Sequence, residues 1–169
     1  MVRSQLAFLS ALFGLALGQS PASACSRAVR HYSDKEISQM AARAFASATT
    51  IADGEVIAPM AAGLDLPEGT LPVAYIRVSR TWKGQIDSQY DNVVPVAYLS
   101  SCDVFLGTKG QKLRILLNGT GIFTADQETN GWASVNEGDA FNREIDRLIG
   151  QPRPGDFTDP GEPPPVKKK

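Results

Sequence analysis

Histidine is nearly absent from this chain: His31 is the only one among 169 residues. One imidazole cannot form a histidine-rich metal site or a relay of several histidines for proton transfer. The residue content of the chain therefore excludes most catalytic sites. We expect His31 to lie on the surface near a helix start. Nothing in the sequence places a pair of carboxylates in a cleft, although two pairs are close in sequence: Asp53 with Glu55, and Asp139 with Glu144. The sequence therefore predicts a protein that is not an enzyme, with no metal site and no cofactor of its own.

The chain also lacks an apolar run long enough to cross a bilayer. The longest run, Leu6 to Gly18, follows the basic Arg3 and precedes the small residues Ala22-Ser23-Ala24. A basic start, a short apolar stretch and a small-residue site are typical of a cleaved export signal. We therefore predict that residues 1–24 are a signal peptide and that the mature protein is periplasmic or secreted, with no transmembrane span.

Neither sign of charge is in excess. Arg3 is the only charged residue of the signal, so the mature chain keeps 16 Lys and Arg against 18 Asp and Glu, a net charge of −2. Without a basic surplus, nothing points to nucleic acid or to an anionic membrane surface. The glycines at 107 and 110 mark a turn and not a phosphate-binding loop.

Cysteine is scarce, with only Cys25 and Cys102. Cleavage after residue 24 makes Cys25 the first mature residue, and in an oxidising compartment two cysteines more often form a disulfide than remain thiols. We predict a Cys25–Cys102 bridge, which in the chain-entropy model stabilises by about 4.5 kcal/mol for a loop of about 78 residues. The alternative is a lipid anchor on Cys25. It is disfavoured because residues 19–24 separate Cys25 from the apolar run and Ala22 replaces the usual large aliphatic residue.

Two helices are predicted, one on each side of a set of strands. The first begins with a capping box of Ser33 and Glu36 and continues in one apolar stripe to Ala48, which should lie against a sheet. The second covers residues 140–149 and has Asp139 as its cap.

The most informative stretch, residues 71–102, contains two long strands. In the first, Ala74, Ile76, Val78 and Trp82 fall largely on one face. In the second, Pro95 must sit at an edge or a bulge, because proline donates no ladder hydrogen bond. The expected strands are 49–58, with a bulge or a sharp bend at Asp53-Gly54, then 73–84, 93–99, 112–117 and the short candidates 122–124 and 132–135.

Short strands with polar turns and two covering helices predict one domain over residues 25–150. Its fold class is mainly β, a five-stranded OB-fold-like barrel with an N-terminal and a C-terminal helix. Residues 151–169 are rich in proline and end in three lysines. They should form a disordered tail, because they cannot bury a core.

Four features follow one another in an order that resembles a known family. A cysteine comes directly after the signal, Phe45 lies at a helix end that leads into a strand, Trp82-Lys83-Gly84 ends a second strand, and Ser100-Ser101-Cys102 precedes an apolar strand over 113–119. Together they resemble the netrin-like domains, best known as the N-terminal half of the tissue inhibitors of metalloproteinases. The resemblance covers residues 25–132 and implies an OB-fold.

The chain departs from that family in two ways. The third mature residue is Arg27 where the inhibitors have a second cysteine, and no cysteine stands around residues 124–126 to pair with one. The disulfide-rich C-terminal subdomain of the animal inhibitors is missing as well. We therefore expect a reduced, single-domain, bacterial-type relative.

The resemblance also implies a mechanism. In the family, the mature N-terminal amine and first carbonyl chelate the catalytic zinc of a metalloprotease, and the second side chain enters its specificity pocket. Carried over, the main chain of Cys25 would be the chelator and Ser26 the pocket residue. Ser100 and Ser101 would form a flanking ridge, held by the bridge at Cys102.

The sequence thus supports two functions. The first is a non-enzymatic binding module of the cell envelope or the secreted fraction, which takes a protein or an envelope ligand on one face of the barrel. The candidate aromatic side chains for such a ligand are Tyr75, Trp82, Tyr98 and Trp132. The alternative is inhibition of a zinc metalloprotease through Cys25.

Overall fold

The structure is a computed structural model that describes residues 31–60, 70–87, 91–130 and 138–158. Its elements in chain order are α1 (Asp34–Ser47), β1 (Thr50–Ala58), β2 (Val73–Lys83), β3 (Val93–Ala97), β4 (Lys112–Thr120), β5 (Ile122–Thr124) and α2 (Gly138–Ile149). The predictions made for residues 1–24, for Cys25 and Ser26, and for a strand at 132–135 lie outside these described residues.

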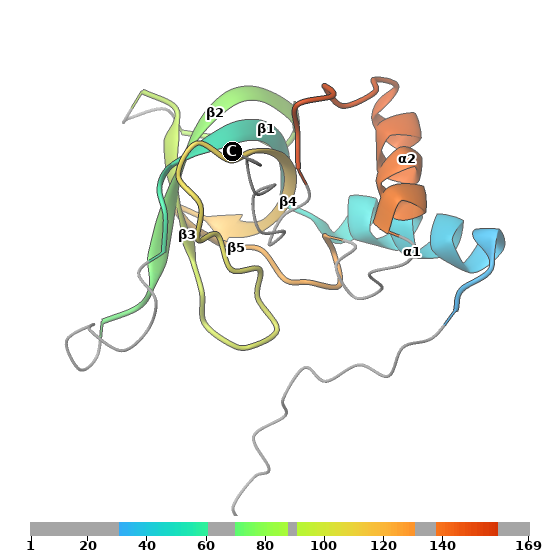
Figure 1. The fold of residues 1–169 in the computed structure, drawn as a ribbon, viewed down its shortest axis with the longest axis horizontal. Coiled ribbons are helices and arrows are strands. Elements are labelled where there is room, and N and C mark those ends of the chain that lie inside the picture. The colour runs from blue at the N-terminus through green and yellow to red at the C-terminus, as the bar shows by residue number, and fades with distance from the viewer. Residues whose placement is uncertain (1–30, 61–69, 88–90, 131–137, 159–169) are drawn as a thin grey trace, which may run out of the picture.

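The five strands close into a barrel in the order β1-β2-β3-β5-β4 (Figure 1). All neighbouring strands are antiparallel except β3 and β5, which run parallel. Figure 1 shows α1 and α2 together on one side of this barrel. A mainly β, OB-fold-like barrel with one helix before the strands and one after them confirms the predicted fold class.

The barrel interior is filled by side chains that alternate along each strand. On β2 the inward residues are Ala74, Ile76 and Val78, as the alternation predicts. No helix follows β3. Instead, Val104 and Leu106 from the segment between β3 and β4 are buried in the barrel. The Met60 N–H donates a hydrogen bond to the Leu106 carbonyl at 2.9 Å.

A bulge at Ser79 changes which side of β2 faces outward. Gly54 pairs with Val78 and Asp53 pairs with Arg80, so Ser79 is an extra residue, and its Oγ donates to the Asp53 carbonyl at 3.1 Å. Since an extra residue inverts the alternation of side chains, the prediction that Trp82 shares a face with Val78 is wrong. The irregularity expected at Asp53-Gly54 is found there as a bulge, although its extra residue lies on β2 and not on β1.

The two helices form a second core on the outside of the barrel. Buried residues of α1 pack against Phe141 and Ile145 of α2 and against Ile51 and Leu116, which point outward from β1 and β4. The capping box of α1 is confirmed. The expectation that α1 lies against a sheet holds only in part, because α2 is its main neighbour. Asp139 lies within the first turn of α2 and not before it.

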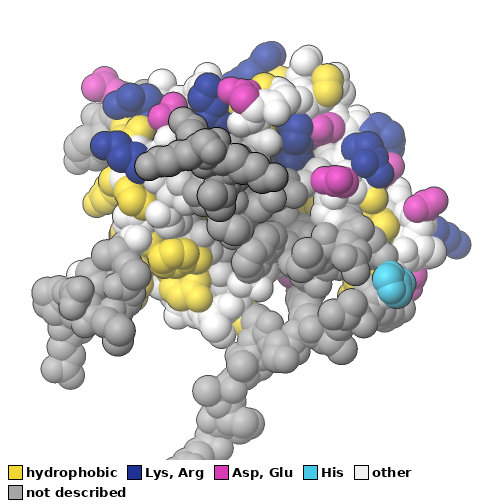
Figure 2. Space-filling view, in the orientation of Figure 1, with side chains coloured by type: hydrophobic (Ala, Val, Ile, Leu, Met, Phe, Trp, Pro, Cys, Tyr) yellow, Lys and Arg dark blue, Asp and Glu magenta, His cyan; other side chains and the backbone are white. Residues whose placement is uncertain are grey.

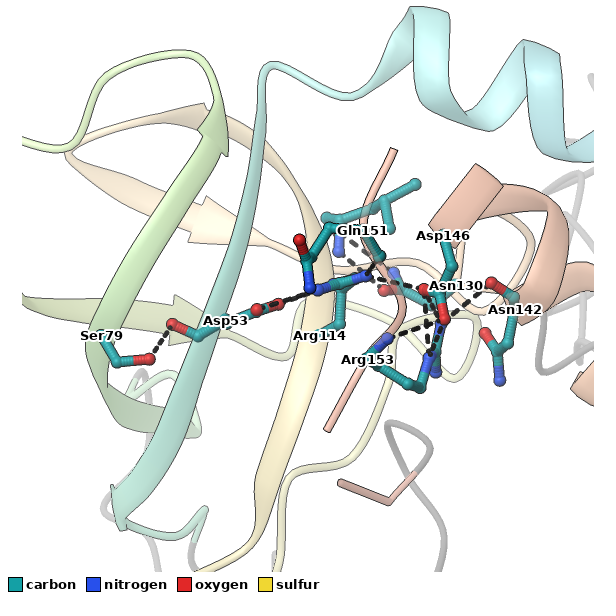
Figure 3. A network of polar contacts seen from close by, with 9 residues as sticks. Asp53, Ser79, Arg114, Asn130, Asn142, Asp146, Gln151 and Arg153 are labelled. Atoms are coloured by element: carbon teal, nitrogen blue, oxygen red, sulfur yellow. Dashed lines mark hydrogen bonds and ion pairs between the residues drawn. The ribbon is translucent and has the colours of Figure 1, made fainter. Parts of the chain in front are cut away.

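A buried cation ties this helical layer to the barrel (Figure 3). The guanidinium of Arg114 donates to both carboxylate oxygens of Asp53 at 2.7 and 3.0 Å, to Asp146 of α2 at 2.7 Å, and to the Gln151 carbonyl at 2.8 Å. Burial alone would lower the pKa of Arg114. The hydrogen bonds and charges of Asp53 and Asp146 outweigh burial and raise this pKa, so the side chain stays charged.

Residues 151–158, which we call the strap, do not behave as the predicted disordered tail. The N–H of Thr158 donates to the Lys112 carbonyl at 2.9 Å, and Asp156 pairs with the Lys112 ammonium at 2.8 Å. Arg153 pairs with Asp146 at 3.3 Å. The strap therefore lies along the start of β4, held by partners that proline content alone does not reveal. Residues 159–169 lie outside the described parts of the chain.

A side chain supplies backbone hydrogen bonds at one edge of β4. Strand β5 pairs with β4 only from Asn118 to Thr120. Just before this stretch, the buried Asn130 accepts a hydrogen bond from the Leu116 N–H at 2.9 Å and donates to the Leu116 carbonyl at 3.1 Å. The amide of Asn130 thus takes the place of a further strand residue, and the edge of β4 is satisfied there.

Replacing Arg114 with Met should lower the free energy of unfolding by about 3–5 kcal/mol, because Asp53 would remain as an uncompensated buried charge. Urea unfolding followed by tryptophan fluorescence measures this change. The matched control is Lys112→Met on the same strand, whose ion pair with Asp156 is exposed (48% and 58%) and should matter little. Equal losses in the two variants would contradict the role given to Arg114.

Candidate functional site

A groove of about 1650 Å³ runs over the outer face of β2 and β3 and ends at the turn between β4 and β5. We call it the β2–β3 groove. Its main side chains are Tyr75 and Arg77 from β2, Val93 and Pro95 from β3, and Ile122 from β5. Tyr75 is 45% exposed and Ile122 is 60% exposed, so both side chains present apolar surface to the groove.

The groove exists because β5 is short. Strand β3 pairs with β5 only at Val96 and Ala97, so the first half of β3 lies along the groove with β2 on one side. Gly119 and Gly121 turn the chain sharply before β5, with φ of +100° and +79°. Pro95 pairs with Tyr75 of β2 and lies immediately before the β3–β5 register begins at Val96, which agrees with its predicted place at an edge or a bulge.

The charges around the groove are mixed. Arg77 is exposed on its floor, and the exposed Asp87 and Asp91 line the end nearest the β2–β3 connection. Two carboxylates and one guanidinium do not form the cationic track that a nucleic-acid backbone requires. The groove is better suited to a ligand with apolar parts and few charges.

The structure does not gather the four predicted ligand-binding aromatics at one place. Only Tyr75 lines the β2–β3 groove. Trp82 packs against the helical core, and Tyr98 packs against the barrel core with its ring edge-to-face on Phe105 at 5.9 Å. Trp132 lies outside the described residues.

The Trp82-Lys83-Gly84 sequence has a structural explanation. The Lys83 ammonium donates to the carbonyls of Phe45 and Ala46, at 2.5 and 2.8 Å, and so satisfies the C-terminal end of α1. Gly84 has a φ of +76°, and a Cβ there would lie 2.2 Å from the Thr49 carbonyl oxygen. Lys83 and Gly84 therefore fix α1 to the end of β2.

Trp82 also has charged neighbours. The guanidinium of Arg80 lies 4.0 Å from the centroid of the Trp82 ring, and that of Arg114 lies 5.0 Å from it. Since a cation over an indole is attracted by the negative face of the ring, these contacts help to hold Arg114 in its buried position. Trp82 thus belongs to the structural network and not to the groove.

A second exposed feature is the turn from Leu99 to Asp103, which we call the ridge. One carboxylate oxygen of the buried Asp103 accepts hydrogen bonds from the N–H groups of Leu99 and Ser100, at 2.7 and 2.9 Å. The Cys102 N–H donates to the Ser100 Oγ at 3.2 Å. The carboxylate thus fixes the turn from within, while Ser100 and Ser101 remain exposed.

Gln127 holds the ridge from the other side. Its N–H donates to the Cys102 carbonyl at 2.8 Å, and its side-chain amide donates to the Ser101 carbonyl at 3.3 Å. Asp103 and Gln127 were not identified from the sequence. The spacing of an Asp three residues after a serine was the available signal for Asp103, whereas the Gln127 contact joins distant parts of the chain.

The described chain contains no free cysteine. Cys102 lies on the ridge, partly buried. Its predicted partner, Cys25, is outside the described residues, so the pairing of the two stays a prediction. The same holds for the wedge of Cys25 and Ser26, of which only the flanking Ser100 and Ser101 can be located.

One member of each carboxylate pair considered from the sequence is engaged elsewhere. Asp53 is bound to Arg114, and Glu144 accepts a hydrogen bond from Arg147 at 2.9 Å. His31 is exposed just before α1. Among the described residues, no three His, Cys, Asp or Glu side chains cluster as metal ligands. In the same parts of the chain, no helix combines the length and apolarity of a membrane span.

A scan against models of known protein families finds no match to this chain, and a search of curated proteins finds none either. The class of the protein is therefore defined by its geometry. It is an OB-fold-like barrel with helices on one side, an exposed groove over β2 and β3, and a rigid ridge after β3. The netrin-like resemblance stays a prediction.

Replacing Asp103 with Ala should destabilise the protein by about 1.5–3 kcal/mol, because two N–H groups lose a charged acceptor. Hydrogen exchange at the amides of Leu99 and Ser100 should accelerate more than exchange elsewhere. Urea unfolding and amide exchange measure the two effects. Asp87→Ala, which removes an exposed carboxylate of the groove, is the control and should change neither. Unaltered exchange at the ridge in Asp103→Ala would show that the carboxylate does not order it.

Proposed function

We propose that this protein is an exported, non-enzymatic binding module that holds a ligand in the β2–β3 groove. The observation that carries the proposal is the place of the groove. In OB-fold proteins, the face of strands 2 and 3 and the loop between strands 4 and 5 bind oligonucleotides and oligosaccharides. Here the groove covers that same face and ends at the β4–β5 turn.

The shape and lining of the groove support an extended ligand. Pockets for small molecules usually measure about 300–1000 Å³, and they enclose most of the ligand. The groove is larger, at about 1650 Å³, and is open along an exposed strand surface. Its floor offers exposed apolar contacts at Tyr75 and Ile122, with polar side chains such as Thr81 and Gln85 beside them. An oligomer laid across the strands would use this surface better than a compact molecule would.

Export and a Cys25–Cys102 disulfide belong to the same proposal. A signal at residues 1–24 would place the mature chain in the cell envelope or the medium, where the available oligomers are peptides, proteins and envelope glycans. Export would separate the protein from nucleic acid, and this agrees with a groove that lacks the cationic track a nucleic-acid backbone requires. A disulfide at Cys102 would fix the mature N-terminus beside the ridge.

The Ile122→Ser variant tests the groove. Because Ile122 would be covered by a ligand, losing its apolar surface should weaken binding by about tenfold. The measurement is an NMR titration of labelled protein with chitooligosaccharides and with a pool of tryptic peptides. Leu99→Ser is the matched control, since Leu99 is 59% exposed, as Ile122 is at 60%, but lies on the ridge. Shifts away from the groove for both probes would refute the proposal.

A second function, metalloprotease inhibition, is favoured by the order of the ridge. A surface that inserts beside a protease active site must lose little conformational entropy on binding, and Asp103 and Gln127 supply that rigidity here. The N-terminal amine of Cys25 would then occupy the open coordination position of the catalytic zinc. This function uses the ridge and leaves the β2–β3 groove free.

Adding one alanine before Cys25 separates the two functions. It should abolish inhibition of zinc proteases, because the displaced amine can no longer reach the metal, and it should leave ligand binding in the groove unchanged. Inhibition constants against a panel of zinc proteases measure the first effect. The non-reduced intact mass is the control, because it shows whether residue 25 has a free amine, a disulfide or a lipid. Equal inhibition by the extended protein would exclude the chelating mechanism.

A further inference from the structure

A second cleft lies beside the β2–β3 groove, and we call it the strap cleft. It is lined by outward residues of β1, β2 and the start of β4, and by the strap, which contributes Pro152, Pro154 and Phe157. Its volume is about 590 Å³. This volume lies within the usual range of small-molecule pockets, about 300–1000 Å³. The strap cleft therefore has room for one end of a larger ligand.

Two of the four cations that line the strap cleft already have partners. Arg114 is bound to Asp53 at 2.7 and 3.0 Å, and Lys112 is bound to Asp156 at 2.8 Å. A cation that is paired with a carboxylate has most of its charge offset, so it attracts a further anion only weakly. These two pairs hold the strap and the strands in place, and we assign them no part in binding.

The other two cations, Arg77 and Arg80, are exposed and have no counter-ion. Within the described parts of the chain, neither forms an ion pair or a hydrogen bond with a carboxylate. One further carboxylate of the cleft, Glu55, lies beside Arg77 in the strand register and offsets part of this charge. Two guanidinium groups against one carboxylate leave a surplus of one positive charge in the strap cleft.

The bulge at Ser79 places Arg80 in the strap cleft. Val78 faces the barrel interior, so regular alternation would turn residue 80 inward as well. Because Ser79 is an extra residue, Arg80 pairs with Asp53 and faces outward, on the same side as Arg77. Figure 3 shows the hydrogen bond from Ser79 to Asp53 at this bulge. Bulges that redirect a side chain are frequent next to active sites.

Trp82 holds the guanidinium of Arg80 in position. This guanidinium lies over the Trp82 ring, 4.0 Å from its centroid, and the ring itself packs against the helical core. A guanidinium held over an aromatic ring keeps the N–H groups at its edge available for an acceptor. A carboxylate matches that edge best, because it accepts two parallel hydrogen bonds. Arg80 is thus positioned for a carboxylate before a ligand arrives.

The strap cleft is continuous with the β2–β3 groove at Arg77, which lines both. Tyr75 in the groove is two residues from Arg77 on the same face of β2, a distance of about 7 Å along a strand. Asp87 and Asp91 line the groove and not the strap cleft, so they disfavour acidic groups within the groove. A ligand that extends over both surfaces should therefore be uncharged in the groove and acidic in the cleft.

The groove favours sugars for the uncharged part of such a ligand. A sugar ring has an apolar face and several hydroxyl groups. The exposed ring of Tyr75 offers a surface for the apolar face, and Thr81 and Gln85 offer neutral polar partners for the hydroxyl groups. Oligosaccharides are among the ligands that OB-folds take on the face of strands 2 and 3.

We propose that the protein binds an oligosaccharide with an acidic sugar at one end. The uncharged sugars lie in the β2–β3 groove, and the carboxylate of the acidic sugar is bound in the strap cleft by Arg80, with Arg77 beside it. This inference rests on the proposed function. It names the ligand class and adds a subsite outside the groove.

The test uses the intact mature protein and three matched probes. They are chitotetraose and two derivatives with one carboxylate each, at the reducing end or at the non-reducing end. In NMR titrations, one acidic derivative should bind about fivefold more tightly than chitotetraose at low salt. High ionic strength should reduce this preference, because the arginines are exposed. The same derivative should shift the Trp82 indole N–H resonance, and chitotetraose should not.

Protein variants locate the carboxylate. Arg80→Gln should remove the preference for the acidic derivative and leave the affinity for chitotetraose unchanged, since Arg80 lines the strap cleft and not the groove. Arg143→Gln is the matched control, because it removes an exposed guanidinium of α2 outside the strap cleft. It should alter neither affinity.

The remaining outcomes separate this inference from the proposed function. Equal binding of the three probes in the groove, or a preference that survives in Arg80→Gln, would overturn the acidic subsite and leave the proposed function standing. If tryptic peptides occupy the groove and the sugars do not, the proposed function again stands and this inference is wrong. If no probe shifts groove resonances, both proposals are wrong.

Discussion

The guanidinium of Arg114 is shared by a barrel strand, a helix and the strap, and the architecture on that side of the molecule depends on it. A buried cation must be surrounded by acceptors, because the cost of removing it from water is otherwise too high. Asp53 on β1, Asp146 on α2 and the Gln151 carbonyl supply them. The bulge at Ser79 contributes as well, since it turns Trp82 outward so that its ring lies 5.0 Å from the Arg114 guanidinium. The Arg114 guanidinium on β4 thus connects residues of β1 and β2 with α2.

This network divides the outer surface of the barrel into two parts. Over β1 and β4, the helices cover Ile51 and Leu116, and the strap covers the start of β4. Over β2 and β3 nothing comparable is described, and the outward residues Tyr75 and Ile122 stay exposed. In Figure 2, acidic and basic side chains are interspersed over the helical side, as expected for a solvated surface. Among the described residues, the helices and the strap thus cover one face of the barrel, and the face of β2 and β3 is the more exposed of the two.

Local signals in the sequence were sufficient for the fold and insufficient for the site. The capping box at Ser33 and the alternation through Ile76 depend on neighbouring residues, so α1 and β2 could be predicted. The inversion at Ser79 depends on the register with β1, which no local pattern records, and Trp82 was therefore placed on the wrong face. The order of the strap has the same origin, because its partners lie on β4 and α2. Tyr75 was named as a candidate and lines the β2–β3 groove, and its binding role stays a prediction. The first part of β3 lacks a β5 neighbour because β5 is three residues long, which no local pattern records.

The groove and the ridge are consecutive parts of one chain segment. Strand β3 ends at Ala97, and the ridge begins at Leu99, so the segment from Val93 to Leu99 spans about 20 Å when extended. The two surfaces present different groups: the exposed side chains of Tyr75 and Ile122 in the groove, and exposed serines on the ridge. A protein ligand of the groove would therefore be able to contact the ridge in the same complex, because protein interfaces of standard size cover about 800 Å² on each partner. The two proposed functions therefore do not exclude each other, since protease inhibition would use the ridge and ligand binding would use the groove.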